Sequence, residues 1–306
     1  MKVDLLIIDP QMDFMDTPSK PGSLAVPGAD ADMRRLASLV ANFGPSLNDI
    51  HVTLDSHHVL DIAHPTWWRD AAGSAPAPFT EISVEDVKTG KWRARIPEFA
   101  QRSLDYVQAL ADDDRYTLRI WPEHCVIGSE GHTIHPELFT ELCSWERKNL
   151  AVVDMVTKGS NPFTEHYSGL KAEVPDDEDA STQMNMGLIQ TLEKADMILI
   201  AGEALSHCVA NTVRDIAASF DPSAISKLVD CFLDRGNCFF HVDGGAHVDH
   251  QFGHGLILFV DGLGQRSQKV PDLLVIVILS QAWSGKRGCE IPAAGNKGGE
   301  EARGES

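Results

Sequence analysis

Short apolar runs recur along the first 230 residues of the chain, and helical or irregular stretches separate them. Residues 3–8, 51–54, 150–156 and 197–201 are such runs, and residues 225–229 form a weaker one. Their apolar residues lack the regular alternation of a half-exposed strand, so each run is typical of a strand that a parallel sheet buries on both faces. We therefore expect an α/β fold.

The stretch between the first two runs, DADMRRLASLVANFG, has helical periodicity. Its apolar residues recur at helical spacing, and Gly44 is suited to end the helix. A strand, a helix and a second strand in this order begin a βαβ unit. Residues 61–119 are irregular and contain several prolines, so we expect a long crossover there that carries small strands or helices.

The charge of the chain excludes several classes of partner. It has 45 acidic and 26 basic residues and a formal net charge of −19, which repels nucleic acid and anionic membrane surfaces. The longest apolar run, residues 273–279, is far shorter than the roughly 20 residues that span a bilayer. The six cysteines form no CxxC pair, as expected for reduced thiols. We expect a cytoplasmic protein that binds neither nucleic acid nor membranes.

Polar residues follow four of the predicted strands at the point where each strand ends. Asp9 follows the first run, Asp55 and His57 the second, Lys158 the third and the Cys208 segment the fourth. Loops after strands are generally polar, so one such residue means little. Four together indicate a site, because ligands of open α/β sheets bind beyond the carboxyl ends of the strands.

Cys208 is the candidate nucleophile. It lies near the first turn of a predicted helix, where unpaired backbone N–H groups and the helix dipole can stabilise a thiolate and a developing oxyanion. A free cysteine is more often a small buried hydrophobic residue. Asp9 and Lys158 could supply a proton acceptor and a positive charge, since they follow neighbouring strands.

A second group of residues is suited to a divalent ion. Asp55, His57 and His124 offer one carboxylate and two imidazoles, which Zn²⁺ or a similar ion accepts while keeping open positions. Four nearby histidines compete for the same role, and periodicity does not choose among them. They are His58, His64, His132 and His135.

Five motifs occur in order: LLIIDPQMDF, TLDSHH, WPEHCVIGSEG, VTKGSNPFTEHYS and GEALSHCVANTVRDIA. Together they resemble the motif series of the nicotinamidase branch of the isochorismatase-like cysteine hydrolases, over about residues 1–230. This resemblance implies a three-layer α/β/α sandwich around a mostly parallel sheet of about six strands. We expect residues 1–230 to form this hydrolase domain.

Position by position, the resemblance implies a catalytic triad of Asp9, Lys158 and Cys208. It also implies a cis peptide bond between Glu203 and Ala204, which would aim the backbone N–H groups of Ala204 and Cys208 at the oxyanion. Asp9 would take the thiol proton, Cys208 would attack the amide carbonyl, and water would hydrolyse the resulting thioester.

The metal ligands that the resemblance implies are Asp55, His57 and His124. The ion would be Zn²⁺ or another divalent metal, which in nicotinamidases holds the pyridine nitrogen of the substrate, and no organic cofactor is required. Phe14 and Trp68 are candidate walls for a flat ring, although an aromatic residue beside a strand more often belongs to the core.

The expected function is hydrolysis of nicotinamide to nicotinate and ammonia by a homo-oligomeric amide hydrolase. Two alternatives remain open. The same triad could cleave another amide or carbamoyl compound, because the sequence does not define the pocket walls. The chain could also be an inactive relative that serves as a binding module, since fold alone does not guarantee function.

The family pattern stops after about residue 230. Residues 231–306 contain nothing recognisable of the family and many glycines, so we predict a divergent C-terminal segment with a disordered end, or even one read from a shifted or unspliced frame. LLVIVIL, residues 273–279, could still supply a last strand. The histidines and aspartates of residues 241–254 could hold a second metal ion, but a flexible loop is the better interpretation.

Overall fold

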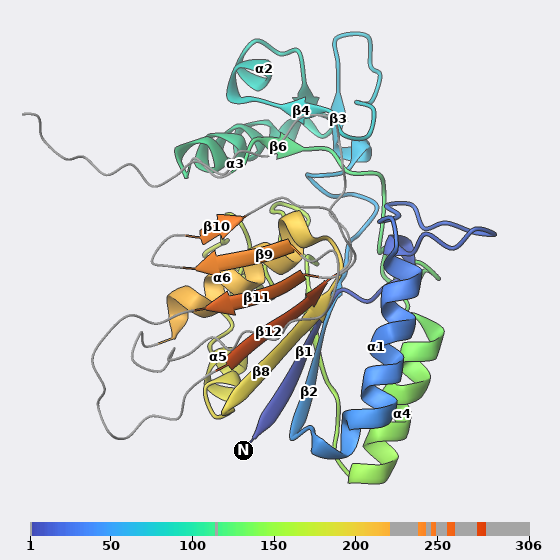
Figure 1. The fold of residues 1–306 in the computed structure, drawn as a ribbon. Helices are drawn as coiled ribbons and strands as arrows, with labels where there is room; N and C mark the ends of the chain where they lie inside the picture. Colours follow the sequence, from blue (N-terminus) through green and yellow to red (C-terminus); the bar gives the residue numbers. More distant parts are fainter. Residues whose placement is uncertain are drawn as a thin grey trace, which may run out of the picture.

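The computed structural model describes residues 2–113 and 116–220, and the backbone of four strands further along the chain (Figure 1). Its central sheet has five described strands in the order β12-β8-β1-β2-β7, and all neighbouring pairs are parallel. These strands are β1 (Val3–Ile8), β2 (Asp49–Asp55), β7 (Asp154–Lys158), β8 (Met197–Gly202) and β12 (Leu274–Leu279). The predicted α/β fold with a parallel sheet is confirmed.

Helices cover both faces of this sheet. Alternate residues of β1 point to opposite faces, so Leu5 and Ile7 lie in one hydrophobic cluster and Leu6 and Ile8 in the other. The first cluster also contains residues of α1 (Ala29–Phe43) and α4 (Pro136–Asn149), and the second contains residues of α3 (Ala100–Asp112), α5 (Met186–Leu192) and α6 (Ala210–Ser219). The layers are therefore helix, sheet and helix.

The predicted crossover of residues 61–119 contains small elements that lie beyond the carboxyl ends of the central strands (Figure 1). They are β3 (Trp68–Arg69), β4 (Glu81–Ile82), α2 (Val84–Lys88), β5 (Arg93–Ala94), α3 and β6 (Leu118–Arg119). β3 pairs with β5, and β4 pairs with β6. Single helical turns occur at Met12–Phe14, Gly44–Ser46, Pro65–Trp67, Pro97–Phe99 and Ala180–Thr182.

The third predicted strand is misplaced. We expected a buried strand over residues 150–156, but β7 begins at Asp154, and the side chains of Leu150 and Val152 are 93% and 76% exposed. Leu150 ends α4 in the left-handed conformation, with φ 52°. β7 is an edge strand of the described sheet, so apolar residues near it are not all covered.

The C-terminal part of the chain is described through four strands. β12 pairs in parallel with β8 from Leu274 opposite Met197 to Leu279 opposite Gly202, so LLVIVIL does add a strand to the sheet. β9 (Cys238–Val242) lies between β10 (Ala246–Val248) and β11 (Leu256–Val260) in a second sheet. The predicted strand at residues 225–229 and the predicted disordered end lie outside the described residues. Among the described helices, none is long and apolar enough to cross a membrane.

Candidate active site

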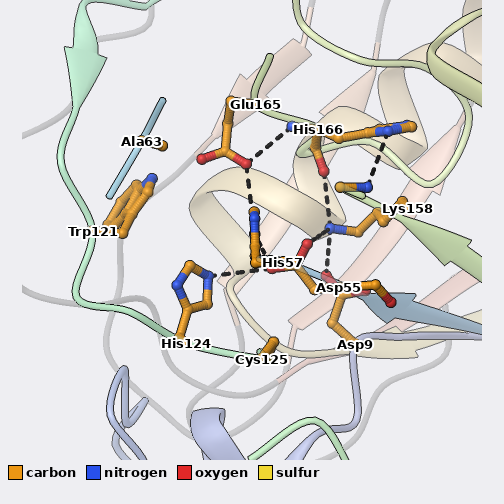
Figure 2. Close-up of polar contacts among 12 residues, drawn as sticks. Asp9, Asp55, His57, Ala63, Trp121, His124, Cys125, Lys158, Glu165 and His166 are labelled. Atoms are coloured by element: carbon orange, nitrogen blue, oxygen red, sulfur yellow. Dashed lines mark hydrogen bonds and ion pairs between the residues drawn. The ribbon is translucent and has the colours of Figure 1, made fainter. Parts of the chain in front are cut away.

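The carboxyl ends of β1, β2 and β7 and the turn after β8 bring the predicted catalytic residues together. Figure 2 shows Asp9 and Lys158 beside Asp55. The ammonium Nζ of Lys158 lies 3.0 Å from Asp9 Oδ2, 3.0 Å from Asp55 Oδ1 and 3.7 Å from Cys208 Sγ. It also donates to the backbone oxygen of His166 at 2.9 Å. Lys158 therefore joins the predicted triad to the predicted metal ligands.

The protonation of this buried group follows from its charges. Burial alone would lower the pKa of Lys158, but Asp55 and Asp9 raise it well above its usual value, so the ammonium stays charged. Burial raises the pKa of Asp9 even though Lys158 opposes the effect. Burial likewise raises the pKa of the Cys208 thiol well above its usual value, against the effect of Lys158. The resting cysteine is thus a thiol that needs a neighbouring base, and Asp9 is placed to be that base.

Thr53 on β2 fixes the carboxylate of Asp9. The Thr53 hydroxyl donates to Asp9 Oδ1 at 2.6 Å and accepts the Asp9 backbone N–H at 3.1 Å. Asp9 has φ 51°, a left-handed conformation that aspartate tolerates better than most residues. Because Oδ1 is engaged by Thr53, Oδ2 is the oxygen that faces Lys158.

Cys208 lies in the turn between β8 and α6. Gly202 begins the turn, where a Cβ atom would come within 2.4 Å of the backbone oxygen of Ile8. Ala204 follows with φ 56°, and Leu205–Val209 form one π-helical turn before α6. Cys208 is 5% exposed. Wide turns of this kind inside helices often mark functional sites.

The expected cis bond before Ala204 is wrong, because the Glu203–Ala204 peptide is trans. The chain instead changes direction through the left-handed conformation of Ala204. Ala204 and Cys208 both line the same cavity. That their backbone N–H groups form an oxyanion hole stays a prediction.

The predicted metal ligands also converge. Asp55 Oδ2 lies 3.1 Å from His57 Nε2 and 3.2 Å from His124 Nε2, and the three candidate donor atoms lie within 4.8 Å of one another. The second nitrogen of each ring is held elsewhere, since His57 Nδ1 contacts Asp61 Oδ2 at 3.0 Å and His124 Nδ1 contacts the Pro122 oxygen at 2.9 Å. This arrangement leaves both Nε2 atoms for an ion, as in known metal sites.

The backbone of Asp55 is held as firmly as its side chain. The amide of Gln11 donates to the Asp55 backbone oxygen and accepts the Asp55 backbone N–H, both at 2.7 Å. Gln11 is fully buried. This pair of hydrogen bonds fixes the residue that the catalytic and metal-binding groups share.

Among the competing histidines, His64 has its ring against those of this cluster. Its ring centroid is 5.1 Å from that of His57 and 5.4 Å from that of His124, and its Nε2 has no hydrogen-bond partner. Burial lowers the pKa of His64 to about 4, so the ring is neutral and able to bind a metal.

The other competing histidines have different surroundings. The side chain of His58 is exposed. His132 Nε2 contacts Ser56 Oγ at 2.8 Å, and His135 Nε2 contacts Asp30 Oδ1 at 3.2 Å. None of the three belongs to the described cluster of Asp55, His57 and His124.

A cavity opens beside Cys208 and the metal-ligand cluster. Its walls include Phe14, as predicted, but Trp68 does not line it. Trp68 is buried in the core, and its indole N–H donates to the Ile62 oxygen at 2.7 Å. Trp121 lines the cavity. The lining residues are Phe14, Leu24, Ala25, Val26, Asp55, Phe79, Trp121, His124, Glu165, Tyr167, Ala204, Ser206, His207 and Cys208.

Sequence reasoning missed Glu165. Its side chain is 4% exposed and lines the cavity, with Oε1 3.9 Å from His57 Nε2 and Oε2 without a hydrogen-bond partner. Burial raises the pKa of this carboxyl group, against the effect of His57. The available signal was its place in the motif VTKGSNPFTEHYS, which also contains Lys158.

The chain is similar to known nicotinamidases. A segment of 97 residues is 30% identical to the nicotinamidase of Escherichia coli (strain K12), and the match covers 31% of this chain and 38% of that enzyme. The chain is thus matched over little more than a third of this relative's length. No protein-family model matches the chain. The resemblance that the motifs predicted is confirmed for that segment.

Several solved structures with a similar fold are named nicotinamidases. Yeast nicotinamidase Pnc1p is 21% identical with a TM-score of 0.48, and the match covers 71% of this chain and 82% of that one. The same enzyme bound to the inhibitor nicotinaldehyde is 19% identical with a TM-score of 0.47 and the same coverage. The Acinetobacter baumanii nicotinamidase is 21% identical with a TM-score of 0.46, and covers 71% of this chain and 78% of that one.

Proposed function

We propose that this protein is a metal-dependent cysteine hydrolase that converts nicotinamide, or a closely similar heteroaromatic carboxamide, to the acid and ammonia. The observation that carries the proposal is the network around Lys158. Within 4 Å its ammonium contacts a candidate base, a candidate nucleophile and a carboxylate of the metal-ligand cluster. The similarity to the nicotinamidase of Escherichia coli agrees with this activity.

The chain's own residues supply the covalent chemistry. Asp9 accepts the thiol proton as Cys208 Sγ attacks the carboxamide carbon, and the N–H groups of Ala204 and Cys208 receive the developing oxyanion. The C–N bond then breaks, and ammonia leaves with the proton that Asp9 held. Asp9 next removes a proton from water, which attacks the thioester and releases the carboxylic acid and the thiol. Lys158 keeps its charge throughout and stabilises both the carboxylate and the thiolate.

The residues of the metal-ligand cluster fit a divalent ion such as Zn²⁺. Asp55, His57 and His124 would hold it, with one anionic oxygen and two neutral imidazoles. When bound, the ion supplies a Lewis acid that can anchor a ring nitrogen. Phe14 and Trp121 lie on the same cavity and would contact the faces or edges of a flat ring.

Ammonia release from a panel of carboxamides tests this function. We expect release from nicotinamide or pyrazinamide by the wild-type protein and a loss of at least a thousandfold in Cys208→Ala. Cys143→Ala on α4 is the matched control and should keep the wild-type rate. Ammonia release from carbamoyl compounds alone would show that the substrates belong to that class instead. No release from any compound of the panel would indicate an inactive relative that serves as a binding protein.

Metal content measured in parallel tests the metal-binding part of the proposal separately from the covalent chemistry. We expect about one divalent ion per chain in the wild-type protein and a strongly reduced content in Asp55→Ala. Removal of the metal with a chelator should abolish activity on ring-nitrogen substrates, and Zn²⁺ should restore it. Full activity in metal-free protein would contradict the role of the cluster.

A further inference from the structure

One carboxylate outside the catalytic and metal-binding groups, that of Asp13, contacts two segments that each carry residues of the cavity wall. Asp13 Oδ2 accepts the backbone N–H of Cys125 at 2.7 Å, and Cys125 directly follows His124. Asp13 Oδ1 accepts the backbone N–H of Ser23 at 3.2 Å. Ser23 directly precedes Leu24, Ala25 and Val26, which form one wall of the cavity.

The backbone of Asp13 is also held on two sides. Its N–H donates to the Gly131 oxygen at 3.0 Å, and its carbonyl accepts the N–H of Leu24 at 3.0 Å. Two positions packed against Asp13 have room for glycine alone. A Cβ atom on Gly22 would lie 2.1 Å from the Asp13 carbonyl oxygen, and one on Gly131 would lie 1.9 Å from Oδ2. Gly22 thus packs against the backbone of Asp13, and Gly131 packs against its carboxylate.

Cys125 has a conformation that needs such support. Its φ is 46°, in the left-handed region that costs a residue with a side chain about 1–2 kcal/mol. Its carbonyl accepts the backbone N–H of His57 at 3.1 Å. The peptide groups of Cys125 thus connect Asp13 to the backbone of both imidazole ligands, His57 and His124.

We propose that Asp13 is a positioning residue that fixes the segment 124–125, which carries the candidate ligand His124, relative to the segment 22–26, which carries the cavity wall of Leu24, Ala25 and Val26. The wall and the ligands then keep the spacing that a ring bound between them requires. The link to catalysis rests on the proposed function, whereas the link between the two segments does not. Neither the triad nor the metal-ligand cluster includes Asp13.

The variant Asp13→Asn removes half of this connection with little change in shape. An amide has one acceptor oxygen and a donor nitrogen, so it can satisfy the N–H of Cys125 or that of Ser23 but not both. Asp16 is a matched control. Its two oxygens also accept one backbone N–H each, from Gly28 at 2.6 Å and from Asp30 at 3.1 Å, at the start of α1.

Two measurements test the proposal on the full chain. Hydrogen exchange should become faster in residues 22–26 and in residues 124–126 together in Asp13→Asn, and in neither segment in Asp16→Asn. The affinity for Zn²⁺ alone, measured by competition with a chelating dye, should fall about 10- to 100-fold in Asp13→Asn, as for other groups that orient metal ligands. Asp16→Asn should bind Zn²⁺ as the wild type does.

Gly131→Ala provides a second variant if Asp13→Asn does not fold, because the added Cβ displaces the same carboxylate without changing its charge. Faster exchange in one segment alone, or equal effects in the Asp16→Asn control, would overturn the proposal. If the wild-type protein binds no Zn²⁺, the proposed metal chemistry fails, and the exchange pattern still decides the role of Asp13.

Discussion

Lys158 lies between two buried carboxylates, with its own side chain 1% exposed. Lys158→Met would leave Asp9 and Asp55 without their shared counter-charge. We expect the free energy of unfolding to fall by about 3–5 kcal/mol, as when one partner of a buried ion pair is removed. Urea denaturation measures this loss.

Lys20→Met is the control for this prediction, because Lys20 pairs with Glu130 at the surface. A surface pair contributes about 0–1 kcal/mol. Equal losses in the two variants would show that Lys158 is not the centre of a buried charge network.

Thr53 allows a test of how the base is held. Thr53→Val keeps the shape of the side chain and removes the hydroxyl that donates to Asp9 Oδ1. A hydrogen bond to a charged group is worth about 1.5–3 kcal/mol, so we expect kcat to fall about 10- to 100-fold while KM stays nearly constant. Thr53→Ser retains the hydroxyl and should recover most of the rate. A Thr53→Val enzyme as fast as the wild type would exclude this role.

At the scale of elements, the residue that ends α4 has a backbone conformation that glycine would adopt at lower cost. Leu150 is left-handed and 93% exposed, so its side chain gains little from packing. Leu150→Gly should raise the free energy of unfolding by about 1 kcal/mol, because glycine adopts this conformation without a Cβ clash. Val152→Gly is the control, since Val152 is also exposed but is not among the left-handed residues. Thermal denaturation should show stabilisation for Leu150→Gly alone, and equal destabilisation of both variants would contradict the account.

The central strands were predictable because burial on both faces leaves an uninterrupted apolar run. β1 and β8 match their predicted ranges closely, and β2 extends its range by a few residues. β7 was misplaced because the apolar residues before it, including Val152, are exposed at an edge of the described sheet, which a local pattern does not reveal.

The site residues that lie directly after strands could be predicted from the sequence. Asp9, Lys158 and Cys208 could be placed together because parallel strands finish at one edge of a sheet. Glu165 belongs to one of the five motifs, but its place beside His57 was not predictable, because its loop is held by distant contacts such as the hydrogen bond from the Glu165 N–H to the Tyr106 hydroxyl. Trp68 was wrongly expected at the cavity, because local sequence does not show which aromatic side chain turns toward it.

For the whole molecule, two neutral histidines, the buried His166 and the partly buried His207, predict sensitivity to acid. Burial lowers the pKa of His207 to about 4 and that of His166 to about 3, from an ordinary value of 6.5. Between these values the unfolded chain binds more protons than the folded chain. Their contribution to stability is therefore present above about pH 6.5 and is lost as the pH falls toward 4.

The variant His207→Phe isolates one of these groups. We expect the wild-type protein to lose about 2 kcal/mol through His207 between pH 7 and pH 5, and this part of the loss should vanish in the variant. His58→Phe, at an exposed position, is the control. Urea denaturation at the two pH values gives the comparison. An identical loss in wild type and His207→Phe would show that His207 does not remain neutral in the folded state.

The central claim is that Cys208 forms a thioester with the acyl group of a carboxamide, and trapping with hydroxylamine tests it most directly. Hydroxylamine competes with water for a thioester and converts it to a hydroxamate. We predict that the wild-type protein, given nicotinamide and hydroxylamine, forms the hydroxamate in proportion to hydroxylamine concentration, and that Cys208→Ala forms none. Ammonia release by the wild type without hydroxamate, or equal hydroxamate formation by Cys208→Ala, would contradict the account.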